Sequence, residues 1–400
     1  MMKNLLVGQS GGPTAVINSS LCGIINEAKS QNKIDKVYGM VNGIEGFLKD
    51  NILDLGNLTV DELNLLKTTP AAFLGSCRYK LPKDFTDETY RALFEKFEKL
   101  SIGYVLYIGG NDSMDTVDKL STYANEVGAD IKFIGVPKTI DNDLMGTDHT
   151  PGFGSAAKFV ANTVRNIVYD AEVYDKESVT IVEIMGRHAG WLTAASVIAR
   201  EKNNDNPLLI YLPESDFCLT KFFDDIKNAL KINKNVVVCV SEGIKDKDGK
   251  FICEYTAEAG VDTFGHKNLT GCGKFLENQV KNKLGVKVRS IELNVTQRCA
   301  SNLLSKTDLE EAYRVGVEGV KVAISDETAK MICMIREGEY EIVYKPVDVN
   351  MISNMEKTFP TEWIKNGNDI SNEFSRYILP LIEGEVEVPM ENGMSKYLRR

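Results

Sequence analysis

The sequence predicts an α/β fold with mainly parallel sheets, and two observations carry this prediction. Short apolar segments rich in β-branched residues recur along the 400 residues, and stretches of helical periodicity separate them. Parallel strands joined by helices produce this alternation, because each helix returns the chain to the same edge of the sheet. We expect two Rossmann-like α/β domains and a C-terminal extension.

Each predicted strand is an apolar run that ends at glycine, proline or polar residues. Strands are expected at residues 4–8, 36–42, 104–110, 132–140, 178–186, 207–213, 235–243 and 287–294. Several of the intervening helices begin at Ser, Thr, Asp or Pro, and they are expected at residues 15–30, 86–100, 112–125, 151–169, 188–201, 219–231, 271–285 and 305–325. Two alternating strands, at 330–337 and 340–347, precede an irregular tail.

No linker of biased composition separates domains, so we place the boundary after the segment PKTIDNDLMGTD, near residue 147. One domain is predicted at residues 1–146, completed by part of residues 300–400. The second is predicted at residues 147–299. The strands and tail of residues 326–400 are expected to pack on the core.

The composition indicates a soluble enzyme of the cytoplasm. Hydrophobic residues make up 43% of the chain and charged residues 26%, as in ordinary globular proteins. No apolar stretch reaches the roughly 18 residues of a membrane span, and the amino terminus lacks a signal-peptide pattern. The net charge of -10 disfavours nucleic acid and anionic membranes. The eight scattered cysteines lack metal-site spacing and are expected to be free thiols.

The first candidate motif is the glycine turn GQSGGPT, which lies between a predicted strand and a predicted helix. Gly11 and Gly12 leave backbone amides free to receive phosphate at a helix amino terminus. A tight turn of no further function would have the same composition. No lysine of a Walker loop follows, so the motif alone does not identify a phosphate site.

Two further turns place polar residues after predicted strands. YIGGNDSMD brings Asn111, Asp112 and Ser113 to the carboxyl end of one strand. PKTIDND brings Lys138, Thr139, Asp141 and Asp143 together after the next, as paired carboxylates beside a lysine. Ligands of open α/β sheets bind at this edge, although Asp and Asn also form turns and helix caps. The coincidence of three such turns favours a functional site.

A second set of charged residues follows later strands. Arg187 follows the strand at 178–186, and Glu242 follows the strand at 235–243. Arg289 and Arg298 lie at the ends of the next strand, nine residues apart. Arginine binds phosphate and glutamate accepts sugar hydroxyls, although either arginine is also suited to a solvated surface.

The three histidines, His149, His188 and His266, share no motif with one another or with the cysteines. Ordinary surface or core placement is therefore favoured over a metal site for each.

Taken together, the motifs resemble those of the phosphofructokinase family over residues 4–325. They are, in chain order, GQSGGPT, FLGSCR, GGNDS, PKTIDND, MGR, SEG and the segment from Arg289 to Arg298 that ends in TQR. The resemblance implies the two-domain fold of that family. It also implies phosphoryl transfer to the 1-hydroxyl of fructose 6-phosphate, in glycolysis.

Within the family, GGDGS with PGTIDND marks ATP users, whereas an acidic residue in the first motif with PKTIDND marks pyrophosphate users. This chain has Asp112 and Lys138 at the two positions. A carboxylate occupies and repels the space of a nucleotide α-phosphate, and a lysine neutralises compact pyrophosphate. The resemblance therefore implies pyrophosphate as the donor in a reversible reaction, and an ATP-dependent kinase of the same fold is the alternative.

The resemblance also assigns residue roles. Asp141 is the expected base, and Lys138 and Arg187 are expected to act with it. The sugar phosphate is expected at Thr139, Asp143, Met185, Gly186, Glu242, Arg289 and Arg298. The donor is expected at Gly11, Gly12, Arg78, Gly110, Asp112, Ser113 and Lys138, with the first domain as the donor domain. The Mg²⁺ of the family is expected beside Asn111 and Asp112.

Arg289 resembles an arginine that reaches into a neighbouring subunit, which implies a homodimer or homotetramer. Three positions depart from the family pattern: Asn111 replaces a magnesium-associated aspartate, Val295 a histidine of bacterial ATP users, and Ser178 an arginine. They leave open sedoheptulose 7-phosphate as a substrate and a non-catalytic regulatory subunit as an alternative. The first helix also lacks basic residues that bind effectors, so weak effector control is expected.

Overall fold

The computed structural model describes residues 2–255 and 271–400, and within them the chain forms two compact units. The first unit consists of Met1–Ser155, Arg298–Glu356 and Glu383–Arg400. The second unit consists of Ala156–Gln297 and Lys357–Ile382. We predicted a change of domain after residue 146, and the contacts change from one unit to the other after Ser155.

The first unit contains a seven-stranded sheet in the order β11-β10-β5-β4-β1-β2-β3. Its strands are β1 (Lys3–Gln9), β2 (Ile34–Met40), β3 (Ile52–Asp54), β4 (Ile102–Gly109), β5 (Lys132–Pro137), β10 (Lys330–Glu337) and β11 (Glu341–Asp348). The five central strands are parallel, and only the two edge strands β3 and β11 run antiparallel to their neighbours. The carboxyl ends of β1, β4 and β5 therefore lie at one edge of the sheet.

Helices cover both faces of this sheet because alternate strand residues point to opposite sides. Leu5 and Val7 of β1 pack in one core with α1, α3 and α10, whereas Leu6 packs in the other with α2, α4 and α5. The helices are α1 (Ile17–Ser30), α2 (Gly43–Leu48), α3 (Val60–Lys67), α4 (Glu88–Lys99), α5 (Asn111–Glu126) and α10 (Lys306–Ile324).

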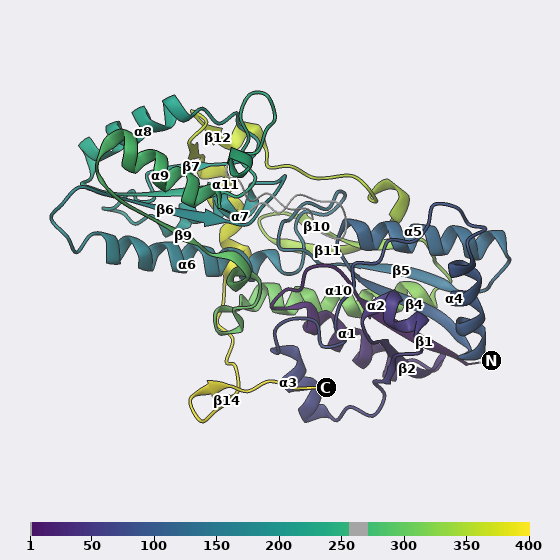
Figure 1. Ribbon diagram of the computed structural model, residues 1–400. Coiled ribbons are helices and arrows are strands. Elements are labelled where there is room, and N and C mark those ends of the chain that lie inside the picture. The colour runs from purple at the N-terminus through teal and green to yellow at the C-terminus, as the bar shows by residue number, and fades with distance from the viewer. Residues whose placement is uncertain (1, 256–270) are drawn as a thin grey trace. The chain divides into compact units, whose positions relative to one another are not determined.

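Helices α1 and α10 lie side by side against the first unit's sheet (Figure 1). Two glycines permit this approach. A Cβ at Gly23 would lie 2.1 Å from the Tyr313 carbonyl oxygen, and one at Gly316 would lie 2.2 Å from that of Ser20. Helix packing thus brings residues about 290 positions apart into one core, and the C-terminal strands complete the N-terminal sheet.

The second unit contains a four-stranded parallel sheet in the order β7-β8-β6-β9. Its strands are β6 (Ser178–Ile184), β7 (Leu209–Tyr211), β8 (Asn235–Ser241) and β9 (Lys287–Glu292). Val179 and Ile181 share a core with α8 (Leu219–Ile232) and α9 (Cys272–Leu284). The chain enters this unit along α6 (Phe153–Ala171).

The segment from Lys357 to Ile382 belongs to the second unit because it surrounds Trp191 with aromatic rings. The Phe359 ring centroid lies 5.1 Å from that of Trp191, and the Tyr377 centroid lies 5.5 Å from it. This segment contains η6 (Thr361–Trp363), β12 (Ile364–Lys365), β13 (Asp369–Ile370), α11 (Asn372–Ile378) and η7 (Leu379–Ile382). Packing of these large rings fixes a tail that the sequence pattern left irregular.

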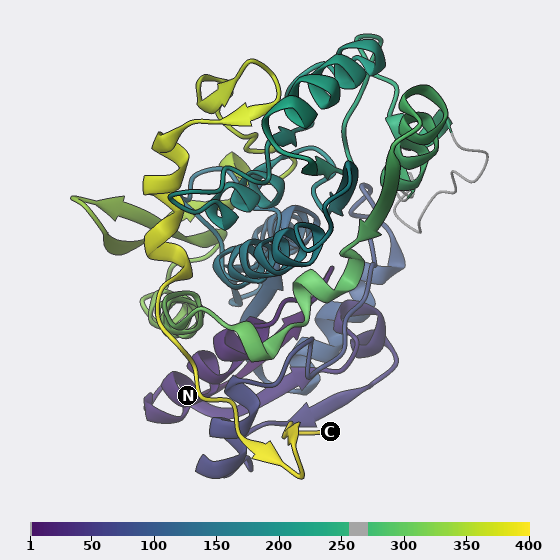
Figure 2. The same cartoon turned by 90° about the vertical axis from the view of Figure 1, so that its left-hand side faces the viewer.

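The last residues return to the first unit, where the yellow tail in Figure 2 passes beside earlier elements. The Leu398 amide donates to Thr69 Oγ1 over 3.0 Å, and Arg400 Nη1 donates to the Leu74 carbonyl over 3.1 Å. The remaining short elements are η2 (Ile252–Tyr255), η3 (Asn294–Arg298), η4 (Ser301–Leu303), η5 (Val349–Met351), β14 (Met390–Glu391) and β15 (Met394–Ser395).

The predicted fold class is confirmed, and most predicted elements are present within a few residues. The helix expected at 188–201 is wrong in extent: α7 covers Trp191–Ala194 and a 3₁₀ turn, η1, covers Ala195–Ala199. A carboxylate outside the helix accounts for the late start, because the Gly190 amide donates to Glu214 Oε1 over 2.9 Å. No helix in the described ranges is long and apolar enough to cross a membrane.

Candidate active site

The glycine turn after β1 forms the first part of the site and is held by its neighbours in the fold. Gly11 has a positive φ of 73°, a conformation that favours glycine. Its carbonyl accepts a hydrogen bond from Ser76 Oγ over 2.6 Å, and its amide donates to the Cys77 carbonyl over 3.3 Å. The turn GQSGGPT and the predicted motif FLGSCR are thereby brought together.

Lys138 lies against this turn and is almost fully buried, with 2% of its surface exposed. Its Nζ donates to the Gly12 carbonyl over 2.5 Å. A Cβ added at Gly12 would lie 3.1 Å from Arg298 Nη1, so a cation from near residue 300 also borders the turn. The first unit thus brings Gly12, Lys138 and Arg298 together from three separate motifs.

Burial lowers the pKa of Lys138 to about 8, and four charged neighbours adjust it. The carboxylate of Asp141 raises the pKa, as does that of Asp143, whereas Arg298 and Arg78 lower it. Three cations and two carboxylates therefore act on one another within the first unit. Cations gathered at a glycine turn suit a ligand that carries several negative charges.

The third part of the site is the amino terminus of α5, where Gly110 is the N-cap residue. Ser113 is buried directly behind the turn, since a Cβ at Gly109 would lie 1.8 Å from Ser113 Oγ. Asp112 lies in the first helical turn, where the helix dipole favours a negative charge. The Lys138 amide donates to the Gly109 carbonyl over 3.0 Å, which joins this turn to the PKTIDND segment.

In the side chain of Asn111, in the same turn, the amide nitrogen forms a hydrogen bond within the described part of the chain and the amide oxygen does not. Its Nδ2 donates to the Met355 carbonyl over 2.7 Å. Its Oδ1 is buried, and no hydrogen-bond partner for it exists among the described residues. A buried amide oxygen without a donor is a suitable ligand for a hard cation such as Mg²⁺. No cluster of three His, Cys, Asp or Glu side chains that would hold a metal is present in residues 2–255 and 271–400.

The PKTIDND segment leaves the sheet early, because β5 ends at Pro137 and not at residue 140 as predicted. The Asp141 amide donates to Thr139 Oγ1 over 3.1 Å. The Thr139 carbonyl accepts from Thr150 Oγ1 over 2.9 Å, and the Thr139 amide donates to the Pro151 carbonyl over 3.2 Å. Thr139 therefore ties the turn that carries Asp141 to residues 150–151.

In the second unit, the MGR turn after β6 is fixed mainly through its backbone. The Gly186 amide donates to Glu242 Oε1 over 3.4 Å, and the Gly186 carbonyl accepts from Ser241 Oγ over 2.5 Å. The Met185 amide donates to Gln297 Oε1 over 3.3 Å. Met185, Gly186 and Glu242, three of the predicted sugar-site residues, therefore lie together at the carboxyl ends of β6 and β8.

Arg187 belongs to the same turn and packs closely against the SEG motif. A Cβ at Gly243 would lie 1.9 Å from the Arg187 carbonyl oxygen, so this position requires glycine. Arg187 Nε is buried and has no hydrogen-bond partner among the described residues. A buried guanidinium nitrogen without an acceptor is suited to an anionic ligand.

Arg289 lies apart from this turn within the second unit. It pairs in register with Thr180 of β6, four residues before Ile184 and thus about 13 Å along the strand from its end. Its Nη1 lies 3.2 Å from Asp170 Oδ2. Ser178, another departure from the family pattern, donates through Oγ to Asn235 Oδ1 over 2.8 Å. The structure therefore does not bring Arg289 to the Gly186 turn of the same chain.

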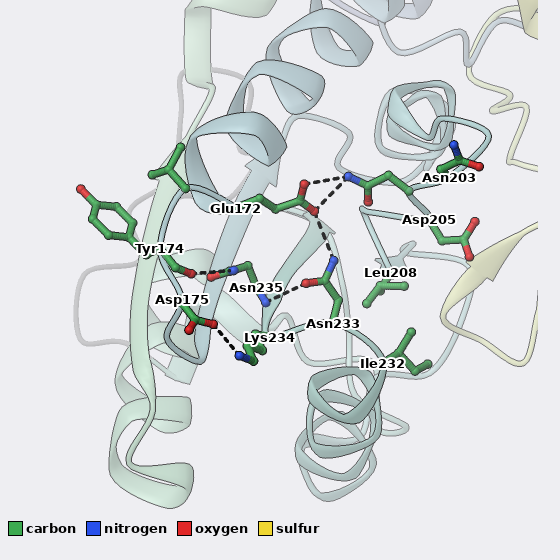
Figure 3. Close-up of a pocket in the computed structure, with 12 residues that line it drawn as sticks. Glu172, Tyr174, Asp175, Asn203, Asp205, Leu208, Ile232, Asn233, Lys234 and Asn235 are labelled. Carbon is green, nitrogen blue, oxygen red and sulfur yellow. Dashed lines mark hydrogen bonds and ion pairs between the residues drawn. The ribbon is translucent and has the colours of Figure 1, made fainter.

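A separate cavity of about 550 Å³ opens in the second unit, near the amino ends of β6 and β8 (Figure 3). Glu172 points into a group of amides and accepts hydrogen bonds from Asn204 and Asn233. Lys234 Nζ lies 2.5 Å from Asp175 Oδ1. Glu172, Asp175 and Lys234 thus have protein partners, and the cavity lies at the edge of the sheet opposite the MGR turn.

The structure describes two of the three histidines. His149 is buried, with 1% of its surface exposed, and His188 is exposed. His266 lies outside the described residues.

Sequence reasoning missed the polar residues that brace the two turns. Gln9 Nε2 donates to Asn18 Oδ1 over 3.0 Å, and Gln9 Oε1 accepts from the Leu74 amide over 2.9 Å. Gln297 holds the Met185 amide in the second unit. The available signals were the glutamine that follows the apolar run NLLVG and the glutamine inside TQR.

Comparison with known proteins identifies the family. The phosphofructokinase family model matches residues 4–323. The pyrophosphate–fructose 6-phosphate 1-phosphotransferase of Xanthomonas campestris pv. campestris is 40% identical, over 99% of this chain and 95% of its own. That of Halomonas elongata is 38% identical, over 98% and 95% of the two chains. The crystal structure of a pyrophosphate-dependent phosphofructokinase from Nitrosospira multiformis superposes with a TM-score of 0.91 at 35% identity, over 100% of this chain and 96% of its own. The chain belongs to the phosphofructokinase family.

Proposed function

We propose that this chain transfers a phosphoryl group from pyrophosphate to the 1-hydroxyl of fructose 6-phosphate, giving fructose 1,6-bisphosphate and phosphate. The reaction is reversible and belongs to glycolysis in the cytoplasm. The observation that carries the proposal is the buried Lys138, which donates to the glycine turn and is flanked electrostatically by Arg78 and Arg298. The similarity to curated pyrophosphate-dependent relatives over nearly the whole chain supports it.

In this proposal the first unit binds the donor. Gly11 and Gly12 of the glycine turn, Gly110 and Ser113 at the start of α5, and Arg78 and Lys138 surround the pyrophosphate oxygens. Asp112 excludes a nucleotide because its carboxylate repels an α-phosphate. Phosphoryl transfer needs little covalent help from the protein, so charge neutralisation and alignment supply most of the catalysis.

Asp141 acts as the general base of this mechanism and accepts the proton of the sugar 1-hydroxyl. Thr139 Oγ1 accepts a hydrogen bond from the Asp141 amide and so sets the shape of the turn. Asp143 lies two residues after Asp141. Lys138 and Arg187 stabilise the negative charge that accumulates on the transferred group.

Mg²⁺ is the proposed cofactor, and the residues of the first unit fit it. The buried, unpartnered Oδ1 of Asn111 is an oxygen ligand, and the carboxylate of Asp112 follows in the same turn. When bound, the ion would neutralise donor phosphate charge. An amide replaces the carboxylate usual for the family at Asn111, so the net charge of the ligand set is less negative.

The second unit contributes to binding of the sugar phosphate through Met185, Gly186, Arg187 and Glu242. Arg298 of the first unit is a further sugar-phosphate ligand in the family pattern. Arg289 is partly exposed and about 13 Å along the sheet from the Gly186 turn, which agrees with a role toward a neighbouring subunit. We therefore propose a homodimer or homotetramer in which Arg289 completes the partner's anion site.

The test is product formation with purified protein, Mg²⁺, fructose 6-phosphate and pyrophosphate. Fructose 1,6-bisphosphate and phosphate should form in equal amounts, and the reverse reaction should proceed from these products. Product with ATP alone identifies an ATP-dependent kinase, and faster turnover of sedoheptulose 7-phosphate changes the assigned sugar. Absence of transfer with either donor indicates a regulatory subunit.

A further inference from the structure

His149 lies at the centre of a buried charged network in the first unit that the reaction itself does not use. Its Nδ1 lies 2.7 Å from Asp148 Oδ1, and its Nε2 lies 2.7 Å from Glu311 Oε2. The side chain is 2% exposed, so water does not replace either contact. Both partners are carboxylates and therefore acceptors when ionised.

The chemistry of the ring decides its protonation state. A neutral imidazole carries one N–H group, so it donates to only one of two ionised carboxylates. Arg336 keeps Asp148 ionised, because its Nε and Nη2 donate to Asp148 Oδ1 over 3.1 and 2.9 Å. Glu311 already accepts a hydrogen bond from the Tyr340 hydroxyl over 2.7 Å. With both carboxylates ionised, hydrogen bonds at both ring nitrogens of His149 require the imidazolium form.

The network joins three elements to the catalytic segment. Glu311 comes from α10, Arg336 from β10, and Tyr340 from the turn between β10 and β11. Two residues before His149 lies Thr147, whose Oγ1 accepts a hydrogen bond from the Met334 amide over 3.0 Å. The Asp148 amide donates to the Met334 carbonyl over 2.8 Å. Residues 147–149 are therefore fastened to the sheet and to α10.

From this anchor, a short path leads to the proposed base. Thr150, next to His149, donates to the Thr139 carbonyl over 2.9 Å. The Thr139 side chain in turn accepts, through Oγ1, a hydrogen bond from the Asp141 amide over 3.1 Å. A second anchor is Asp308 of α10, which accepts the Gly152 amide over 2.9 Å. The position of Asp141 thus depends on how residues 147–152 are held.

We propose that His149 is a positioning residue, which acts on Asp141 by holding residues 147–152 through simultaneous hydrogen bonds from both ring nitrogens to Asp148 and Glu311. The inference rests on the role proposed for Asp141. His149 is buried and is not among the residues proposed to bind the donor or the sugar, so its loss should change the rate of the chemical step more than substrate affinity. It also makes the geometry of the site depend on pH.

The direction of that pH dependence follows from the surroundings of the ring. Burial lowers the pKa of His149, but hydrogen bonds and charges from Asp148 and Glu311 outweigh it and leave the pKa raised. The stabilisation is therefore complete below the ordinary histidine pKa of about 6.5 and is lost as the pH rises through the raised value. Burial raises the pKa of Asp308 to about 6, so this second anchor becomes protonated as the pH falls through that value, on the acid side of the range in which His149 loses its proton. Tyr340 and Tyr344 face Glu311, and burial raises the pKa of both.

The informative variant is Glu311→Gln. It keeps a side chain beside His149 Nε2, but that nitrogen no longer has to carry a proton. The new Oε1 still accepts from the Tyr340 hydroxyl, and the new amide donates to the unprotonated Nε2 of a neutral His149. The network then no longer needs the imidazolium, so kcat should lose the alkaline decline that His149 causes. His149→Gln should lower kcat at all pH values by up to about 100-fold, the scale of a small misplacement, with little change in KM. Glu310→Gln, an exposed carboxylate on the same helix, is the control.

The decisive readout that does not use activity is ¹⁵N NMR of the histidine rings in the folded protein. Both ring nitrogens of His149 should be protonated at pH 7 in the wild type, and one in Glu311→Gln. A neutral His149 ring at pH 7 in the wild type overturns the proposal even if His149→Gln does not fold. An unchanged kcat profile in Glu311→Gln overturns it as well. If Asp141→Asn retains activity while the NMR result holds, the assignment of the base fails and the charged anchor stands.

Discussion

The two units of this phosphofructokinase prepare their turns by different means. In the first unit, Lys138 is buried beside a glycine turn and interacts with Asp141 and Arg298, so charge dominates. In the second unit, the backbone of the Gly186 turn is held by Ser241, Gln297 and Glu242. Changes at Lys138 and Asp141 of the first unit should therefore alter catalysis and donor choice. Changes at Met185 and Glu242 of the second unit should alter sugar affinity.

The largest effect is expected at the proposed base. Asp141→Asn keeps the size of the side chain and removes its ability to accept a proton, so kcat should fall by roughly two to four decades while KM changes little. Steady-state kinetics with both substrates measure this. A variant with wild-type kcat would remove Asp141 from the mechanism and with it the contrast between the units.

A smaller effect of a different kind is expected at Glu242 in the second unit. Glu242→Gln keeps an oxygen that accepts the Gly186 amide but removes the charge toward sugar hydroxyls. Because a hydrogen bond to a charged group contributes about 1.5–3 kcal/mol, kcat/KM for the sugar should fall roughly 10- to 100-fold, mainly through KM. Glu177→Gln, exposed in the same unit, is the control. A fall in kcat alone would contradict the division of roles.

Arg289 of the second unit has two possible roles, one within its own chain and one in the sugar-phosphate site of a neighbouring subunit, and these roles predict different results. If it serves only its own chain, Asp170→Ala should reproduce the effect of Arg289→Ala, since the two side chains form an ion pair. That exposed pair is worth about 0–1 kcal/mol of stability. If it serves a neighbour, Arg289→Ala alone should raise KM for the sugar phosphate. Mixing Arg289→Ala with Asp141→Asn should then restore some activity by subunit exchange, and full activity of an isolated monomer would refute the shared site.

The smallest effect is the pH dependence of donor binding. Burial lowers the pKa of Lys138 to about 8, so the cation is lost as the pH rises through this value. KM for pyrophosphate should therefore increase above pH 8, by at most about tenfold per pH unit. In Lys138→Arg the charge persists, so any remaining pyrophosphate binding should lack this increase. The same pH dependence in both proteins would exclude Lys138 as its source.

The sequence predicted the sheet class and the order of the strands well, because parallel strands with buried faces appear in the sequence as local apolar runs, although most strands end two or three residues earlier than predicted. Motif residues at those ends, such as Gly12 and Lys138, lie together as the topology requires. The contacts of His149 were not predictable, because Glu311 is 162 residues away in the sequence. Similarly, the aromatic rings around Trp191 come from a tail without a clear pattern. Long-range packing, which no local period encodes, decides such contacts.

The helix expected at 188–201 is an error of another kind, because here the sequence pattern predicted a longer helix than the structure contains. Its residues have a helical pattern, but the Gly190 amide donates to Glu214, and α7 begins only at Trp191. A tertiary hydrogen bond of the Gly190 amide there overrode local propensity.

The central claim is that Asp112 and Lys138 select pyrophosphate, and the ratio of kcat/KM for pyrophosphate to kcat/KM for ATP tests it most directly. The ratio should be measured in the wild type, in Asp112→Gly, in Lys138→Gly and in the double variant. We predict a wild type that prefers pyrophosphate, a gain of ATP use in Asp112→Gly and a loss of pyrophosphate use in Lys138→Gly. A wild type that prefers ATP would contradict the account.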